Sequence, residues 1–153
     1  MSKLLRRVIV AQNAKRLLLG FRHIHQHQRE AGGILLGYER EDAIFISRAT
    51  IPTTFDRATR RTFVRSPEYA QAIVEYEFAN SGGRLTYVGE WHSHPESHPT
   101  PSPRDTRMIE EQFAGNEIHV GQLVMLIIGT VDVHCSVFDG ERHVQAACDL
   151  RVK

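Results

Sequence analysis

Apolar residues along the chain follow two kinds of spacing, one typical of strands and one typical of helices. Seven short runs rich in apolar and β-branched residues have the length of strands, and they lie at residues 7–10, 34–38, 43–47, 84–94, 123–129, 131–138 and 142–147. Three longer segments have helical spacing or helix-start signals, and they lie at residues 12–29, 66–81 and 103–114. This alternation predicts an α/β sandwich around a mixed sheet.

Glycine, proline and serine residues mark the expected ends of these elements. Gly32 and Gly33 end the first predicted helix. Ser66-Pro67 begins the second, with serine as the cap and proline at the first helical position. We find no repeat and no interdomain linker, so residues 1–153 are expected to form a single domain.

The composition is that of an ordinary globular protein. Apolar residues make up 41% and charged residues 24% of the 153 residues. No apolar run approaches the roughly 20 residues that cross a bilayer, and no secretory signal is recognisable, so we expect a cytoplasmic protein with no membrane partner. The net charge of +1 provides little general attraction to nucleic acid. Cys135 and Cys148 form no CxxC pair and are expected to be free thiols.

A candidate metal site lies between residues 90 and 105, with the spacing HxH, seven residues, SxxD, and a proline directly after the second histidine. His92 and His94 are one residue apart on an expected strand, so both imidazoles project from one face and can reach one ion. Asp105 falls on the first turn of a helix that begins at Ser102 or Pro103, where its carboxylate supplies a third ligand. Three protein ligands leave one place for water, as in catalytic zinc sites. We therefore expect His92, His94 and Asp105 to bind Zn²⁺.

Such a site would supply the nucleophile for hydrolysis, because zinc lowers the pKa of its bound water from about 15.7 toward 7. A carboxylate outside the ligand set should accept the water's proton and later pass it to a leaving amine. Glu30 is our candidate, at the expected end of the first helix and beside paired glycines that permit close approach of the backbone. Ser102 would stabilise the oxyanion of the tetrahedral intermediate, a contribution of about 3 kcal/mol. It can cap the following helix as well.

Together these residues resemble the JAMM metalloproteases, also called the JAB or MPN+ family. The resemblance covers nearly the whole chain and is carried by Glu30-Ala31-Gly32-Gly33-Ile34-Leu35-Leu36-Gly37, His92-Ser93-His94-Pro95, Ser102 and Asp105. It implies a three-layer α-β-α sandwich with a mixed central sheet, as in cytidine deaminases. It also implies that His92, His94 and Asp105 hold zinc, that Glu30 is the general base and that Ser102 stabilises the oxyanion. The family cleaves peptide or isopeptide bonds after the C-terminal glycine of ubiquitin or ubiquitin-like proteins.

Four segments are similar, more narrowly, to small stand-alone bacterial members: EAGGILLGYER, ISRATIP, DRATRRTFVRSP and GRLTYVGEWHSHPESHPTPS. These members include the deconjugating protease of type II CBASS anti-phage systems. There, an activating and conjugating enzyme of the operon attaches the C-terminal tail of a cGAS-like nucleotidyltransferase to target molecules, and the resemblance implies that this chain removes it. Similar proteases of other bacterial ubiquitin-like pathways or of sulfur-carrier pathways are the alternative.

Four arginines lie close together at Arg57, Arg60, Arg61 and Arg65. Such a run is commonly a solvated loop. By the resemblance, however, this segment corresponds to the place where JAMM proteases carry an insertion that holds the extended tail of the substrate. Our hypothesis is that it pairs with the tail by strand addition, with its arginines on carboxylates or backbone carbonyls.

Other histidines, and the two residues before His92, are expected to lie outside the ligand set. His98 is expected to be exposed at the rim of the site, where it could touch substrate, because the ligand set is complete without it. His23, His25 and His27 alternate along the expected helix, so they point in different directions and indicate a polar helix face. Trp91 is expected in the core, and Glu90 could support a metal ligand from outside the ligand set.

Three other classes of protein fit the sequence less well. A non-catalytic MPN scaffold would lack the metal ligands that are present here. A zinc deaminase needs HxE followed by PCxxC, and no PCxxC follows the HxE at His94-Pro95-Glu96. A nucleic-acid-binding domain is disfavoured because 18 acidic residues offset 19 basic ones and no recognition motif is found.

Overall fold

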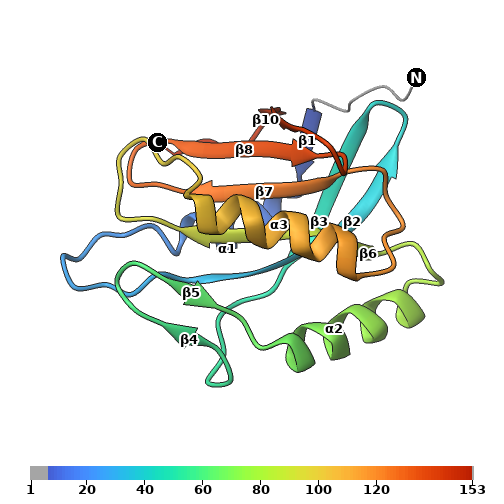
Figure 1. Cartoon of the computed structure of the whole chain (residues 1–153), viewed down its shortest axis with the longest axis horizontal. Coiled ribbons are helices and arrows are strands. Elements are labelled where there is room, and N and C mark those ends of the chain that lie inside the picture. Colours follow the sequence, from blue (N-terminus) through green and yellow to red (C-terminus); the bar gives the residue numbers. More distant parts are fainter. Residues whose placement is uncertain (1–6, 153) are drawn as a thin grey trace.

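The computed structural model of the protein describes residues 7–152 (Figure 1). Its main sheet has eight strands in the order β10-β1-β3-β2-β6-β7-β8-β9. Strand β1 is parallel to β3 and β10, β6 is parallel to β7, and the other neighbours are antiparallel. The strands are β1 Arg7–Val10, β2 Gly32–Arg40, β3 Ala43–Ala49, β6 Thr86–Ser93, β7 Leu123–Ile128, β8 Val133–Phe138, β9 His143–Gln145 and β10 Ala147–Cys148.

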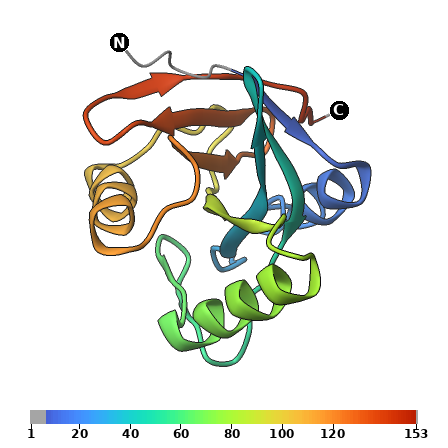
Figure 2. The same cartoon turned by 90° about the vertical axis from the view of Figure 1, so that its right-hand side faces the viewer.

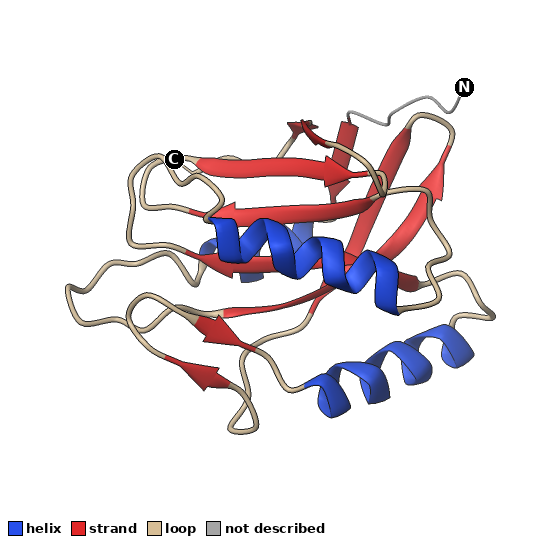
Figure 3. Ribbon diagram, in the orientation of Figure 1, coloured by secondary structure: helices blue, strands red, loops and turns tan. Residues whose placement is uncertain are grey.

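Helices cover both faces of this sheet (Figure 2). Helix α1 (Gln12–Leu19) packs on one face, and α2 (Pro67–Asn80) and α3 (Pro103–Gly115) lie on the other. The expected α/β sandwich with a mixed central sheet is therefore confirmed (Figure 3). Among residues 7–152, no helix has the length and apolar character that crossing a bilayer requires.

The first helix is much shorter than the predicted 12–29, and this prediction was wrong. Helix α1 ends at Leu19, and the segment between it and β2 consists of turns, bends and irregular backbone. Gly20 follows the last helical residue and would cost about 1 kcal/mol inside a helix. The predicted helical residue Gln28 instead ties the loop together, since its side chain accepts from the Ile24 N–H at 3.0 Å and donates to the Arg22 carbonyl at 3.0 Å.

The arginine-rich segment, expected to be irregular, contains a hairpin of β4 (Arg57–Ala58) and β5 (Phe63–Val64). The Thr59 N–H donates to the Thr62 carbonyl at 2.9 Å, and the two threonine hydroxyls lie 2.8 Å apart. Strands of two residues are too short to show a hydrophobic period, so the pattern could not predict them. We call residues 57–66 the β4–β5 hairpin below.

Strand β6 is the central strand that carries the histidines, and all eight of its residues are buried. Side chains alternate between its two faces. Trp91 faces the core beside Phe21, with ring centroids 5.4 Å apart, as predicted for a core residue. Glu90 and His92 face the side of α2 and α3. Buried polar side chains on a central strand need partners, so this face is a candidate for function.

Gly89 permits the close approach of β6 to β7. A Cβ built on Gly89 would lie 2.0 Å from the Val124 carbonyl oxygen, which belongs to the paired backbone of β7. We therefore expect Gly89→Ala to lower the free energy of unfolding by about 3 kcal/mol, because neither strand can move away without breaking the sheet. Chemical denaturation would measure this loss. Gly115→Ala is the control, since nothing lies within 4 Å of the added Cβ, and equal stability of the two variants would contradict the prediction.

Candidate metal centre

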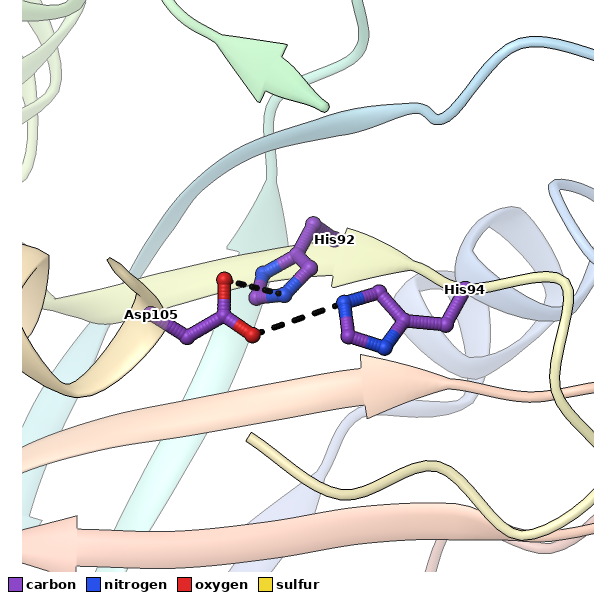
Figure 4. Close-up of side chains that lie close together, drawn as sticks. All are labelled: His92, His94 and Asp105. Carbon is purple, nitrogen blue, oxygen red and sulfur yellow. Dashed lines mark ion pairs between the residues drawn. The ribbon is translucent and has the colours of Figure 1, made fainter. Parts of the chain in front are cut away.

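Three side chains from two elements converge on one point (Figure 4). His92 belongs to β6, His94 follows the end of this strand, and Asp105 lies in the first turn of α3. His92 Nε2 is 3.2 Å from Asp105 Oδ1, and His94 Nε2 is 3.4 Å from Asp105 Oδ2. One potential ligand atom of each residue lies within 4.8 Å of the others. The structure thus brings together the three residues that the sequence proposed as ligands.

The start of α3 fixes the carboxylate of Asp105. Ser102 is the N-cap of this helix, and its Oγ accepts from the Asp105 N–H at 3.1 Å. In return, Asp105 Oδ2 accepts from the Ser102 N–H at 2.8 Å, which completes a capping box. This arrangement confirms the predicted helix start and explains why the carboxylate points back toward the histidines.

These residues fit a zinc ion. His92 Nε2 is buried and makes no well-aligned hydrogen bond among the described residues. The carboxylate oxygen 3.2 Å from it belongs to Asp105, itself a candidate ligand, so the lone pair of this nitrogen is available to a cation. His94 Nδ1 lies 2.9 Å from Glu96 Oε1, and a proton held there leaves Nε2 free to bind metal. Burial raises the pKa of Asp105, but the neighbouring imidazoles lower it more strongly, so the carboxylate is ionised. Two nitrogens and one carboxylate oxygen are ligands that catalytic zinc prefers.

Glu30 lines the same cavity as this cluster. The sequence predicted it at the end of the first helix, and this prediction was wrong. It belongs to the loop before β2, and the pairing of Gly32 with His92 brings it to the metal-centre end of β6. The cavity measures about 710 Å³ and is also lined by Ser102 and by Arg61 through Arg65 of the β4–β5 hairpin. Glu30 and Ser102 therefore line one cavity with the three candidate ligands, and their roles remain predictions.

A family model for prokaryotic homologues of the JAB domain matches residues 5–142. The chain belongs to this family. The match includes the three candidate metal ligands, Glu30 and most of the sheet. The resemblance inferred from the sequence motifs is therefore confirmed.

This JAB domain is similar to proteins named CD-NTase/cGAS isopeptidase. The Escherichia coli protein is 30% identical over 126 residues, which cover 82% of this chain and 78% of the relative. The Pseudomonas aeruginosa protein is 42% identical over 76 residues, and this match spans 50% of the chain and about half, 48%, of that relative. A solution structure of a protein from Desulfitobacterium hafniense shares the fold, with a TM-score of 0.66, 19% identity and coverage of 95% of this chain and 94% of that chain.

His23, His25 and His27, predicted to form a polar helix face, lie instead in the loop after α1. His23 is a buried loop residue whose Nε2 lies 2.8 Å from Ser93 Oγ, and this oxygen also accepts from the Ala31 N–H at 2.9 Å. His25 is exposed in the same loop. His98 is exposed, as predicted, and it pairs with Asp132 outside the cluster of candidate ligands.

Glu90 does not support a metal ligand as we had considered. Its carboxylate binds Arg65, so this arginine is not part of a solvated loop either. Sequence reasoning missed the pair because its members are 25 residues apart. The signal in the sequence was the alternation along β6, which places Glu90 on the same buried face as His92. A buried carboxylate needs a partner of opposite charge.

The carboxyl group of Glu30 should make the stability of the metal-free JAB domain depend on pH. Burial raises its pKa from the ordinary 4.5 to about 7, with smaller and opposing contributions from His94 and Asp105. The folded protein therefore retains a proton that the unfolded chain releases, and stability is lost as the pH rises from about 4.5 to about 7. We expect the melting temperature of the wild type, relative to that of Glu30→Gln, to fall across this range. Thermal melts of both metal-free proteins between about pH 5 and pH 8 would measure it, and a constant difference would contradict the assignment.

Proposed function

We propose that this JAB domain is a zinc-dependent isopeptidase that hydrolyses the bond after the C-terminus of a conjugated ubiquitin-like protein. The observation that carries the proposal is the convergence of the His92, His94 and Asp105 ligand atoms within 4.8 Å of one another, in the cavity that contains Glu30. Three donors beside an open cavity and a carboxylate with a raised pKa are the parts that metal-assisted hydrolysis needs.

Each residue has a separate task in this reaction. His92, His94 and Asp105 would hold the zinc, which when bound polarises water and the scissile carbonyl. Glu30 accepts a proton from the attacking water and delivers it to the leaving amine, for which a pKa near 7 is well suited. The Ser102 hydroxyl accepts from the Asp105 N–H and still has its own proton to donate, so it can stabilise the oxyanion.

The proposed substrate is a cGAS-like nucleotidyltransferase joined through its C-terminal tail to another molecule. The names of the relatives support this choice. The β4–β5 hairpin would pair with the extended tail by strand addition, and the exposed Arg61 would meet its carboxylates or carbonyls. An activating and conjugating enzyme of the same operon would make the conjugate in the cytoplasm.

A fusion protein tests this function directly. A cGAS-like nucleotidyltransferase carrying a reporter after its last residue should lose the reporter when mixed with the zinc-loaded domain. The matched control is the same fusion without the final residues of the tail, which should remain intact. Release from a sulfur-carrier fusion alone would favour the alternative pathway, and release from neither by zinc-loaded protein would refute the proposal.

A further inference from the structure

Arg65, Glu90 and Gln112 form a hydrogen-bonded cluster beside the metal centre. Arg65 Nε donates to Glu90 Oε1 and Arg65 Nη2 donates to Glu90 Oε2, both at 2.9 Å, which is the bidentate geometry of a strong ion pair. Arg65 Nη2 also donates to Gln112 Oε1 at 3.0 Å. The Tyr87 hydroxyl donates to the same carboxylate. Burial and the adjacent Glu90 raise the pKa of Tyr87, so this hydroxyl keeps its proton.

The ion pair is largely withdrawn from water, since the side chains of Arg65 and Glu90 are 17% and 5% exposed. Buried ion pairs often add little net stability compared with apolar residues of similar volume, because both charges lose their hydration. They do fix geometry, because the planar guanidinium accepts a carboxylate in a defined orientation. The location of the pair in the fold is therefore more informative than its contribution to stability.

Arg65 joins the β4–β5 hairpin to both elements that carry the predicted metal ligands. It directly follows β5. Its partner Glu90 lies two residues before His92 on the same face of β6. Its second partner Gln112 belongs to α3, the helix whose first turn holds Asp105. One side chain thus links the hairpin to both elements that carry the predicted ligands.

The hairpin has two further attachments, both to the segment that carries Glu30. The Thr59 carbonyl accepts from the Glu30 N–H at 2.7 Å. The Phe63 ring lies against Gly32, where an added Cβ would be only 2.5 Å from the ring. Residues Arg61 through Arg65 of the hairpin line one side of the cavity, and β6 and α3 contribute to the rest of its lining. The width of the cavity therefore depends on how firmly the hairpin is held.

We propose that Arg65 is a positioning residue that holds the β4–β5 hairpin at the distance from His92 and Glu30 at which an extended peptide fits between them. It acts through the hairpin and does not touch the reacting atoms. The proposal rests on the proposed function, because it assigns the hairpin as a wall of the substrate site. Its test therefore includes a measurement that does not depend on catalysis.

The kinetic test compares Arg65→Lys with the wild type on the reporter fusion. Lysine keeps the positive charge but lacks the two parallel N–H groups with which the guanidinium binds Glu90. The hairpin should therefore loosen without leaving a buried carboxylate unpaired. We expect KM to rise about tenfold while kcat changes less than about threefold, because the hairpin contacts substrate away from the bond that breaks. Arg48→Lys is the matched control, since Arg48 is 60% exposed and contacts Glu77 through a single 3.5 Å ion pair on another part of the surface. Its KM should equal that of the wild type.

The second test measures the hairpin itself by limited trypsin digestion. Arg57, Arg60 and Arg61 are exposed in the hairpin, so trypsin cleavage there reports how often it detaches. We expect nicking to be about tenfold faster in Arg65→Lys than in the wild type or in Arg48→Lys. Glu90→Gln serves as a second variant should Arg65→Lys fold poorly, because the amide retains one acceptor for Arg65 and should produce an intermediate rate.

The outcomes separate the two proposals. Faster nicking together with a raised KM supports the positioning role. An unchanged nicking rate overturns it, even where KM rises, since Arg65 would then act on substrate directly. Faster nicking with an unchanged KM also overturns it, because a detached hairpin would not matter for binding. If the wild type cleaves no fusion, the proposed function fails, and an unchanged nicking rate would reject the anchoring role independently.

Discussion

Replacing His92 with alanine should remove zinc from the protein and abolish hydrolysis of the reporter fusion. The variant loses the buried nitrogen that has no other partner among the described residues, and two donors remain, one fewer than catalytic zinc sites use. Without the ion, several kcal/mol of transition-state stabilisation are lost, which corresponds to a fall in kcat/KM of about 10⁴-fold. Metal analysis by mass spectrometry and single-turnover kinetics would measure both effects.

His98→Ala is the control for this experiment. His98 lies in the loop between the ligands but is exposed and outside the cluster, so its loss should leave zinc content and activity at wild-type values. Exhaustive chelation of the wild type should reproduce the inactivity of His92→Ala, and added zinc should restore only the wild type. Full activity of the chelated wild type would refute the metal-dependent mechanism.

Glu30→Gln should lower kcat by about 10²- to 10⁴-fold while zinc content stays unchanged. Glutamine matches the shape of glutamate but cannot accept the proton of the attacking water. Glu30 lies outside the cluster of three candidate ligands, so its replacement separates proton transfer from metal binding. The measurement is kcat on the reporter fusion together with metal content.

The control for Glu30→Gln is Glu141→Gln, which changes an exposed glutamate in the turn before β9. It should retain wild-type turnover. A Glu30→Gln enzyme that keeps most of its kcat would show that another group accepts the proton. A variant that loses zinc would show instead that Glu30 belongs to the ligand set.

The parts of the site that could be predicted from the sequence are those encoded by local spacing. Alternation along a strand placed His92 beside His94, and a serine three residues before an aspartate indicated a capped helix start. Both signals depend only on neighbours in the chain. For this reason, the approach of Asp105 to the two histidines could be expected without knowing the rest of the fold.

Contacts between distant segments could not be predicted in the same way. The burial of His23 depends on a hydrogen bond with Ser93, 70 residues away, and Arg65 depends on Glu90 and Gln112 in other elements. The first helix was predicted too long because its apolar period continues past Gly20. Phe21 in fact packs against Trp91, and Ile24 is 72% exposed, so the segment has no continuous apolar face to bury.

The pairing of Gly32 with His92 has a consequence for where the chain tolerates changes in length. Glu30 lies two residues before Gly32, so the register of β2 against β6 positions its carboxyl group relative to the candidate ligands. The length of the loop before Glu30 matters less. We therefore expect insertions or deletions among positions 24–27 to leave the carboxylate in place. We expect one residue added between Glu30 and Gly32 to redirect the carboxylate away from the candidate ligands and to remove the proposed activity while leaving the architecture intact.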